Sequence, residues 1–133
     1  MAIDLAVNGT LMRGLALNGN MLGAGAAFVR EARTAPIYRL WSIGDRHPAM
    51  IRAASGGASV ELEIWAVPPE GLARILLQEP PGLCIGKVAL ADGTEVLGVL
   101  GEPLLCEGQP EITRYGGWRA YMASRTNTEE GRA

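Results

Sequence analysis

The residue best suited to proton transfer is a glutamate at the end of an expected helix. Glu79 directly precedes Pro80, where an apolar helix face stops. The helix dipole disfavours a carboxylate at this end, and partial burial would raise its pKa and suit it to general acid/base catalysis. The alternative is a solvated surface glutamate, the usual state of this residue type.

A glycine-rich loop is the second candidate, and its chemistry would be anion binding. Residues 9–14 have the sequence Gly-Thr-Leu-Met-Arg-Gly and follow an apolar stretch expected to be a strand. Glycine at a strand end lets successive backbone N–H groups turn inward and hold a carboxylate or carbonyl oxygen. A strand-ending turn that happens to be rich in glycine is the alternative.

Two pairs of polar residues on expected strands are candidate supports. Glu61 and Glu63 are two apart, so both face the same side, either a polar pocket or water. Tyr38 and Arg39 are adjacent, so only one of them can face the interior. Arg39 could clamp a carboxylate with two hydrogen bonds, although a surface position is the default for arginine.

Histidine and aromatic residues offer weaker candidates. His47 is the single histidine and lies in a Gly-Asp-Arg-His-Pro sequence typical of a turn, so we expect it to be solvated and not catalytic. Tyr115, beside Gly116-Gly117, is a candidate to close over a pocket, and the end of a helix or strand is the plainer interpretation. The three tryptophans are expected in the core or at its rim.

Composition excludes several classes of function. The formal charge is -2 with no basic stripe, which argues against nucleic-acid and membrane partners. Two cysteines and one histidine are too few for a structural zinc site, which takes about four ligands. We therefore expect no metal and no cofactor. Cys84 and Cys106 are expected to be free, buried thiols.

The elements that must position these residues are short strands joined by turns. With 133 residues the chain fits one domain. The fold class predicted is α+β: a mixed curled sheet or small β-barrel with one or two packed helices. Residues 12–26 fit either a loose helix or a loop. The expected strands are 3–7, 27–33, 37–43, 49–54, 60–67, 85–90 and 94–100, with a helix between Pro68 and Pro80 and a hairpin turn at Asp92-Gly93.

The ends of the chain give further expectations. The domain is expected to span residues 1–124, and residues 125–133 are polar and expected to be a disordered tail. The start lacks the pattern of a signal peptide and no apolar run is long enough to span a membrane. We therefore expect a cytoplasmic protein.

Several motifs resemble the γ-glutamylcyclotransferase-like proteins. The run Asn8-Gly9-Thr10-Leu11 resembles their aromatic-Gly-Ser/Thr-Leu loop. Glu63-Ile64-Trp65-Ala66-Val67 and the following helix resemble their next signature, in which the helix ends at the catalytic glutamate. The resemblance therefore implies that Glu79 is the acid/base residue. Asn8 is a departure, since that family usually has an aromatic residue there.

A closer resemblance, over about residues 3–123, is to the C-terminal domain of allophanate hydrolases. It rests on residues 28–40, on Pro69-Glu70-Gly71, on 85–88 and 91–93, and most of all on residues 115–121, Tyr-Gly-Gly-Trp-Arg-Ala-Tyr. Leu11 is a departure, because some of these domains have a histidine near this place. The chain carries no signature of the amidase that precedes this domain in the full-length enzymes, so a stand-alone copy is expected.

These resemblances imply a function in handling a small amide- or urea-type metabolite that carries a carboxylate. One alternative is a cofactor-free cyclotransferase that releases 5-oxoproline, and another is a non-catalytic subunit that docks on a separate amidase. A homodimer is also expected. The implied site has Glu79 as the catalytic residue, with Asn8, Gly9, Thr10, Leu11, Gly14, Tyr38, Arg39, Glu63 and Tyr115 binding substrate.

Overall fold

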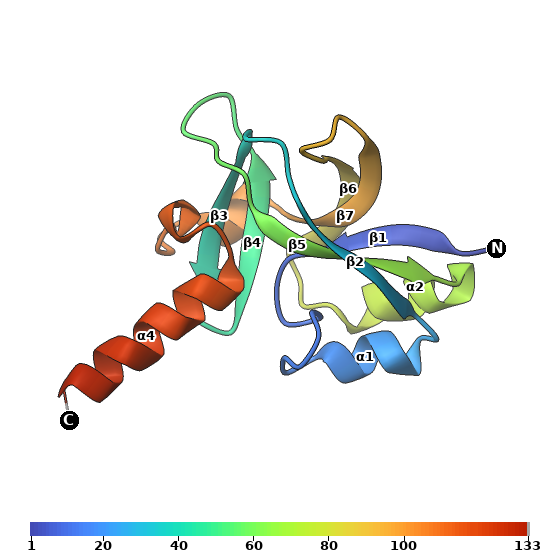
Figure 1. Ribbon diagram of the computed structural model, residues 1–133, viewed down its shortest axis with the longest axis horizontal. Helices are drawn as coiled ribbons and strands as arrows, with labels where there is room; N and C mark the ends of the chain where they lie inside the picture. The colour runs from blue at the N-terminus through green and yellow to red at the C-terminus, as the bar shows by residue number, and fades with distance from the viewer. Residues whose placement is uncertain (133) are drawn as a thin grey trace.

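The structure, a computed structural model, describes the backbone of residues 1–132 and the side chains as far as residue 125. In this part of the chain, seven strands form two sheets (Figure 1). The larger sheet has the order β2-β5-β1-β7-β6; β1 is parallel to β7 and the other neighbours are antiparallel. The smaller sheet pairs β3 with β4. The strands are β1 (Ile3–Val7), β2 (Ala27–Arg33), β3 (Tyr38–Ile43), β4 (His47–Arg52), β5 (Glu61–Val67), β6 (Leu83–Ala89) and β7 (Glu95–Gly101).

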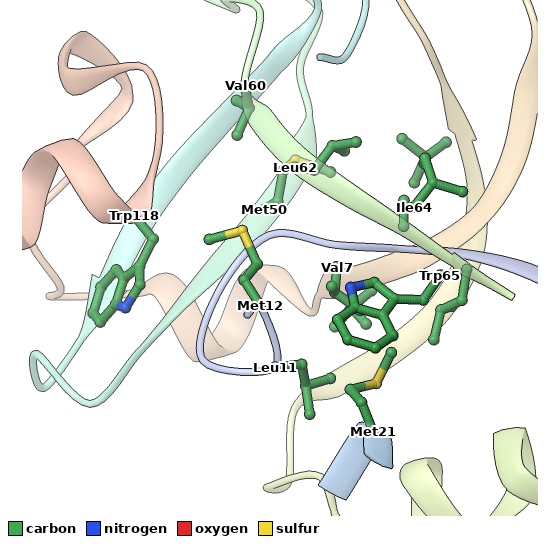
Figure 2. Close-up of a cluster of buried hydrophobic side chains, with 14 of the residues drawn as sticks. Val7, Leu11, Met12, Met21, Met50, Val60, Leu62, Ile64, Trp65 and Trp118 are labelled. Carbon is green, nitrogen blue, oxygen red and sulfur yellow. The ribbon is translucent and has the colours of Figure 1, made fainter. Parts of the chain in front are cut away.

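The core forms on the central strands because these carry the apolar runs. Leu5, Ala6 and Val7 of β1 are buried, as expected for a strand with a neighbour on each side. Figure 2 shows apolar side chains of β1 and β5 converging with Met21, from a helix, and Met12, from the loop after β1. Burial of this cluster drives folding of the domain.

The large sheet curls until its two edge strands touch at one end. Thr34, after β2, forms a β-bridge with Leu90, after β6. Beside this bridge the Ala35 N–H donates to the Ala89 carbonyl at 3.0 Å, and the Ala91 N–H donates to the Arg33 carbonyl at 2.9 Å. The remainder of the two edges does not pair within the described residues, so the sheet is curled and unclosed, and the predicted fold class is confirmed.

The helices lie around this sheet. Helices α1 and α2 cover one side of it (Figure 1), where Gly71 of α2 packs so closely that a Cβ there would lie 2.3 Å from the Ala24 carbonyl oxygen. Pro69 opens α2, as proline can at a first helical position, and Glu79 caps its end. The helical elements are α1 (Asn18–Gly23), α2 (Pro69–Gln78), α3 (Pro103–Cys106), the 3₁₀ turn η1 (Thr113–Tyr115) and α4 (Trp118–Arg132).

The small sheet packs against β7 of the large one. Gly101 permits this contact, since a Cβ there would lie 2.7 Å from the Ala49 side chain. The strand β4 begins at His47, two residues before the predicted start. Proline at position 48 is compatible with a strand here because β4 pairs only with β3 and lies at a sheet edge.

Other sequence expectations have mixed outcomes. Residues 12–26 contain turns and then the short helix α1, and the apolar stretch 103–106 forms α3. The backbone of α4 continues through residues 125–132 of the predicted tail. The side chains of residues 126–132 and all of residue 133 lie outside the described residues, so the boundary at 124 stays a prediction. Within the described part, no helix combines the length and apolar character needed to cross a bilayer.

Candidate functional site

An open pocket lies where the loop after β1, the start of β4 and the end of α2 meet. The space between its walls and the adjoining open solvent together amount to about 270 Å³. Five residues predicted for the site line it together: Asn8, Gly9, Thr10, Leu11 and Glu79. The remaining lining residues are Val7, His47, Pro48, Leu83 and Val99. The structure thus brings the predicted loop and the predicted acid/base residue to one place.

Three successive backbone N–H groups in this lining have no acceptor within the described residues: those of Gly9, Thr10 and Leu11. The loop is held through its carbonyl groups instead. The Gly9 carbonyl accepts from the Met12 N–H at 3.0 Å, and the Thr10 carbonyl accepts from the Leu17 N–H at 2.9 Å. Successive backbone N–H groups without acceptors carry partial positive charge, and together they can form a hollow that binds an anion.

Glycine is required at position 9 for space. Its φ is not positive, so the freedom of glycine to adopt unusual backbone angles is not what the position uses. A Cβ on Gly9 would lie 2.4 Å from the Cδ and 2.7 Å from the Cγ of Pro48. The ring of Pro48 therefore packs directly on the loop and sets its place in the pocket wall.

The neighbours of Gly9 are fixed by burial. Asn8 is buried and its side-chain amide donates to the Val99 carbonyl at 3.0 Å, which ties the loop to β7. Leu11 is also buried, and its side chain packs in the core near Met21 (Figure 2). Leu11 can therefore contact a ligand only through its backbone, and it cannot take the place of the histidine that some of the related domains have near this position.

Glu79 has the environment expected of a proton-transfer residue. It is half-buried at the end of α2, and its carboxylate has no hydrogen-bond or ion-pair partner among the described residues. Burial without a partner raises the pKa of Glu79, because desolvation disfavours the charged form. Glu79 therefore takes up a proton at a higher pH than a solvated glutamate does.

His47 lines the pocket, although sequence reasoning did not place it in the site. It was expected to be solvated in a turn, but it is half-buried as the first residue of β4 and lines the pocket with Glu79. Its Nδ1 lies 3.1 Å from the Pro48 carbonyl oxygen. The only signal in the sequence was its position next to Pro48, which packs on Gly9.

Glu63 was predicted to support the ligand, but the structure places it outside the pocket lining in a network of the protein's own donors. It is 2% exposed. Its Oε1 accepts from the Arg13 backbone N–H at 2.9 Å and from Trp65 Nε1 at 3.1 Å. Its Oε2 accepts from Arg13 Nε and Arg119 Nη2, both at 3.1 Å. The network holds the loop from behind, so Glu63 can only position the site.

The same donors decide the charge state of Glu63. Burial by itself raises the pKa of this carboxyl group, but the hydrogen bonds from Arg13, Trp65 and Arg119 outweigh burial and hold the pKa below its usual value. Glu63 is therefore a fixed anion at neutral pH, in contrast to Glu79.

Arg39 clamps a carboxylate as predicted, but the carboxylate belongs to the protein. Its Nε donates to Glu111 Oε2 at 3.0 Å and its Nη2 donates to Glu111 Oε1. Glu111 follows α3 and is 72 residues away in sequence. Because the guanidinium is occupied outside the pocket lining, the predicted ligand contact has no support in the geometry.

The three other predicted residues also lie outside the pocket lining. Tyr38 is fully buried, and its hydroxyl accepts from the Ala89 N–H at 2.9 Å. Tyr115 packs edge-on against Tyr121, with ring centroids 5.1 Å apart. Gly14 is exposed with φ of 75° and only turns the chain. Their predicted contacts with substrate have no support in this arrangement.

Metal and disulfide chemistry find no support in the described residues. They contain no cluster of three or more histidine, cysteine or acidic side chains that could hold a metal ion. Cys84 and Cys106 are both free, but only Cys106 is buried. The expectation of buried thiols is therefore wrong for Cys84, whose strand β6 is an edge of the large sheet.

The sequence matches known proteins over nearly its whole length. The sequence model of the allophanate hydrolase C-terminal domain matches residues 3–123. The urea amidolyase of Saccharomyces cerevisiae is 31% identical over 128 residues, a match that covers 91% of this chain and 7% of the yeast protein. The chain therefore spans less than a tenth of that relative's length.

Solved structures extend these similarities. A uropathogenic E. coli-specific protein is 60% identical with a TM-score of 0.91, and the match covers 92% of this chain and 97% of that one. Kluyveromyces lactis allophanate hydrolase is 27% identical with a TM-score of 0.87, covering 93% of this chain and 21% of that one. An AIG2-like protein from Mus musculus, 20% identical with a TM-score of 0.62 over 84% of this chain and 86% of that one, shares the fold.

Proposed function

Because the chain belongs to the family of allophanate hydrolase C-terminal domains, we propose that it acts on a small amide or urea that carries a carboxylate. The ligand's carboxylate binds to the N–H groups of Gly9, Thr10 and Leu11. Glu79 then moves a proton at the nitrogen of the amide or urea group.

One observation carries this proposal: a set of unpaired donors and an unpaired carboxyl group share one pocket. The three N–H groups have no acceptor within the described residues, and they belong to residues that line the pocket together with Glu79. A bound carboxylate would gain hydrogen bonds that the protein leaves unmade, and charge-assisted bonds of this kind are strong.

The environment of Glu79 supports its role as the proton carrier. Its pKa is raised by burial, which brings the group closer to the pH at which it would work. It would accept a proton from the attacking group and deliver it to the departing nitrogen in the next step. Its single-residue mechanism needs no metal ligand set, which agrees with the residues that line the pocket.

A second candidate is cyclotransferase chemistry, which the same Glu79 observation favours. The α-amine of a γ-glutamyl amine would attack the γ-carbonyl carbon, forming one C–N bond while the original amide C–N bond breaks. Glu79 would accept the proton from the attacking amine and deliver it to the leaving amine. The similarity to the AIG2-like protein supports only the shared fold. Which substrate the protein turns over therefore has to distinguish the two candidate functions.

The test is a panel of ligands measured by thermal shift and by turnover. The panel contains allophanate, biuret, malonamate and a γ-glutamyl amine, and the proteins are wild type, Glu79→Gln and Glu70→Gln. Glu70 lies exposed on the same helix, so it controls for loss of a helix carboxylate. We expect Glu79→Gln to lose at least about a hundredfold in turnover while it still binds malonamate.

The outcomes separate the candidates. Turnover of allophanate supports the proposed function, and turnover of the γ-glutamyl amine alone supports the cyclotransferase. Ligand stabilisation without turnover, equal in all three proteins, would refute Glu79 as a catalyst. In that case the non-catalytic subunit of a separate amidase becomes the better proposal. Docking on an amidase, a homodimer and a cytoplasmic location stay predictions.

A further inference from the structure

His47 occupies a place in the pocket for which the proposed function gives no role. It is half-buried at the start of β4 and lines the pocket together with the glycine loop and Glu79. The adjacent Pro48 packs against Gly9. His47 is therefore held beside the carboxylate-binding loop by the same contact that positions the loop.

The hydrogen bond of His47 shows which of its two ring nitrogens is already occupied and which is left for a ligand. Its Nδ1 lies 3.1 Å from the Pro48 carbonyl oxygen, and a carbonyl oxygen can only accept. The hydrogen of the neutral ring must therefore be on Nδ1. This tautomer leaves Nε2 with a lone pair, so Nε2 accepts a hydrogen bond from a donor.

The other residues that line the pocket limit which part of the ligand can bind to Nε2. Val7, Pro48, Leu83 and Val99 offer apolar side chains. The side-chain amide of Asn8 is bonded to the Val99 carbonyl, the loop supplies donors for a carboxylate, and Glu79 serves proton transfer. With the Thr10 hydroxyl and the Asn8 Oδ1, the Nε2 of His47 is one of the lining groups left to recognise the other end of the ligand, and it is the one on the β4 side of the pocket.

We propose that His47 selects ligands whose end distal to the carboxylate carries an N–H donor, as in a primary amide or urea, by accepting its hydrogen bond at Nε2. This inference rests on the proposed function, because it takes the ligand's carboxylate to be in the glycine loop. It adds a specificity-determining residue and narrows the substrate class to amides and ureas with a free N–H.

The test compares two isosteric ligands on wild type and two variants. Malonamate carries a carboxylate and a primary amide, and isovalerate has the same shape with an isopropyl group in place of the amide. His47→Asn keeps a donor at the position of Nδ1 and removes Nε2. His47→Gln places an acceptor near the position of Nε2. Dissociation constants are measured by calorimetry, and thermal unfolding of each free protein checks its fold.

We expect wild type to bind malonamate about threefold to tenfold more tightly than isovalerate, the effect of one hydrogen bond. His47→Asn should abolish this preference with little change for isovalerate, and His47→Gln should restore part of it. Equal preference in wild type and His47→Asn would overturn the inference. So would an equal loss for both ligands, which indicates a structural role. If wild type binds neither ligand, the carboxylate site itself fails and the proposed function falls with the inference.

Discussion

Two glutamates of this protein show how local donors decide the chemistry of one residue type. Glu63 is the more deeply buried, yet four hydrogen bonds to its oxygens hold its pKa low. Glu79 is half-buried and has no partner among the described residues, so burial raises its pKa. The residue whose charge is least stabilised is the one in the pocket, as expected where function and stability conflict.

This contrast predicts how stability depends on pH in Glu79→Gln. Since the folded pKa of Glu79 is raised, its ionisation destabilises the fold at pH values above that pKa, and this cost is absent below the unfolded value. Glu79→Gln should therefore be at least as stable as wild type at neutral pH, and the difference should shrink on acidification. Thermal unfolding across pH measures it, and a variant less stable than wild type at neutral pH would contradict this account.

The contact between Gly9 and Pro48 gives a second prediction at this scale. Gly9→Ala should destabilise the protein by about 1–3 kcal/mol, because its Cβ would overlap the proline ring, and it should weaken binding of malonamate. Pro48→Ala removes both clashing ring carbons, so the double variant should recover part of the loss. Gly19→Ala is the control, since a Cβ there meets nothing within 4 Å. Urea denaturation measures all four, and equal losses in the single and double variants would contradict the clash.

At the scale of elements, the loop after β1 is held by two anchors. Asn8 ties its start to β7 through the Val99 carbonyl. Arg13 ties its middle to β5 through Glu63, and Arg119 of α4 donates to both the Arg13 carbonyl and Glu63. The pocket wall is thus fixed by strands on both sides and by the start of α4, which explains how an irregular loop can keep three N–H groups unpaired.

The bond between Arg13 and Glu63 predicts that Glu63 contributes more to stability than Glu31, which also bonds to Arg13. Glu63→Gln should cost about 1–3 kcal/mol, because it removes a buried acceptor of four donors. Since the pKa of Glu63 is lowered, its contribution is present above the unfolded pKa and lost as pH falls through the folded one. The deficit of the variant should therefore narrow in acid.

The matched control for Glu63→Gln is Glu31→Gln. Glu31 pairs with Arg13 at 2.8 Å but is 74% exposed, so its loss should cost no more than about 0.5 kcal/mol. Denaturation of both variants at neutral and acid pH makes the comparison. Equal costs for the two glutamates would refute the anchoring role of Glu63.

Local patterns predicted the elements well and the loop's partners poorly. The alternation in β5, the Asp92-Gly93 turn and the proline start of α2 are short-range signals, and each lies where the sequence predicts it. The loop residues and Glu79 were predicted from local chemistry and from the family resemblance, and they line one pocket. The partner of Arg39 is 72 residues away, and no local pattern marks a contact of that separation.

The same limit explains why His47 was missed. A lone histidine before a proline is typical of a turn, and only tertiary packing of Pro48 on Gly9 brings it to the pocket. Alternation left Glu63 facing either a pocket or water, and the donors that occupy it come from the loop and from α4. Residues 62–65 of β5 are all buried, so alternation does not predict the burial of Glu63, and the identity of its partners also depends on the assembled fold.

At the scale of the whole molecule, two sheets must stay in register for the pocket to exist. The loop belongs to the large sheet, and His47 and Pro48 belong to the small one. Tyr38 joins the two: it lies on β3, and its hydroxyl accepts from the Ala89 N–H of β6 at 2.9 Å and from Arg52 at 3.1 Å. A residue predicted to bind substrate therefore acts as a tie between sheets.

Replacement of Tyr38 tests whether this residue stabilises the fold or binds the ligand. Tyr38→Phe should destabilise the protein by about 1–3 kcal/mol, because the Ala89 N–H loses its acceptor, while the affinity for malonamate stays unchanged. Tyr115→Phe is the control, since the hydroxyl of Tyr115 bonds to the exposed Arg114 and to Ser124 at the surface, and it should change stability by no more than about 0.5 kcal/mol. Chemical denaturation and calorimetry give both quantities. Loss of affinity in Tyr38→Phe without loss of stability would return Tyr38 to the binding site and contradict its role as a tie.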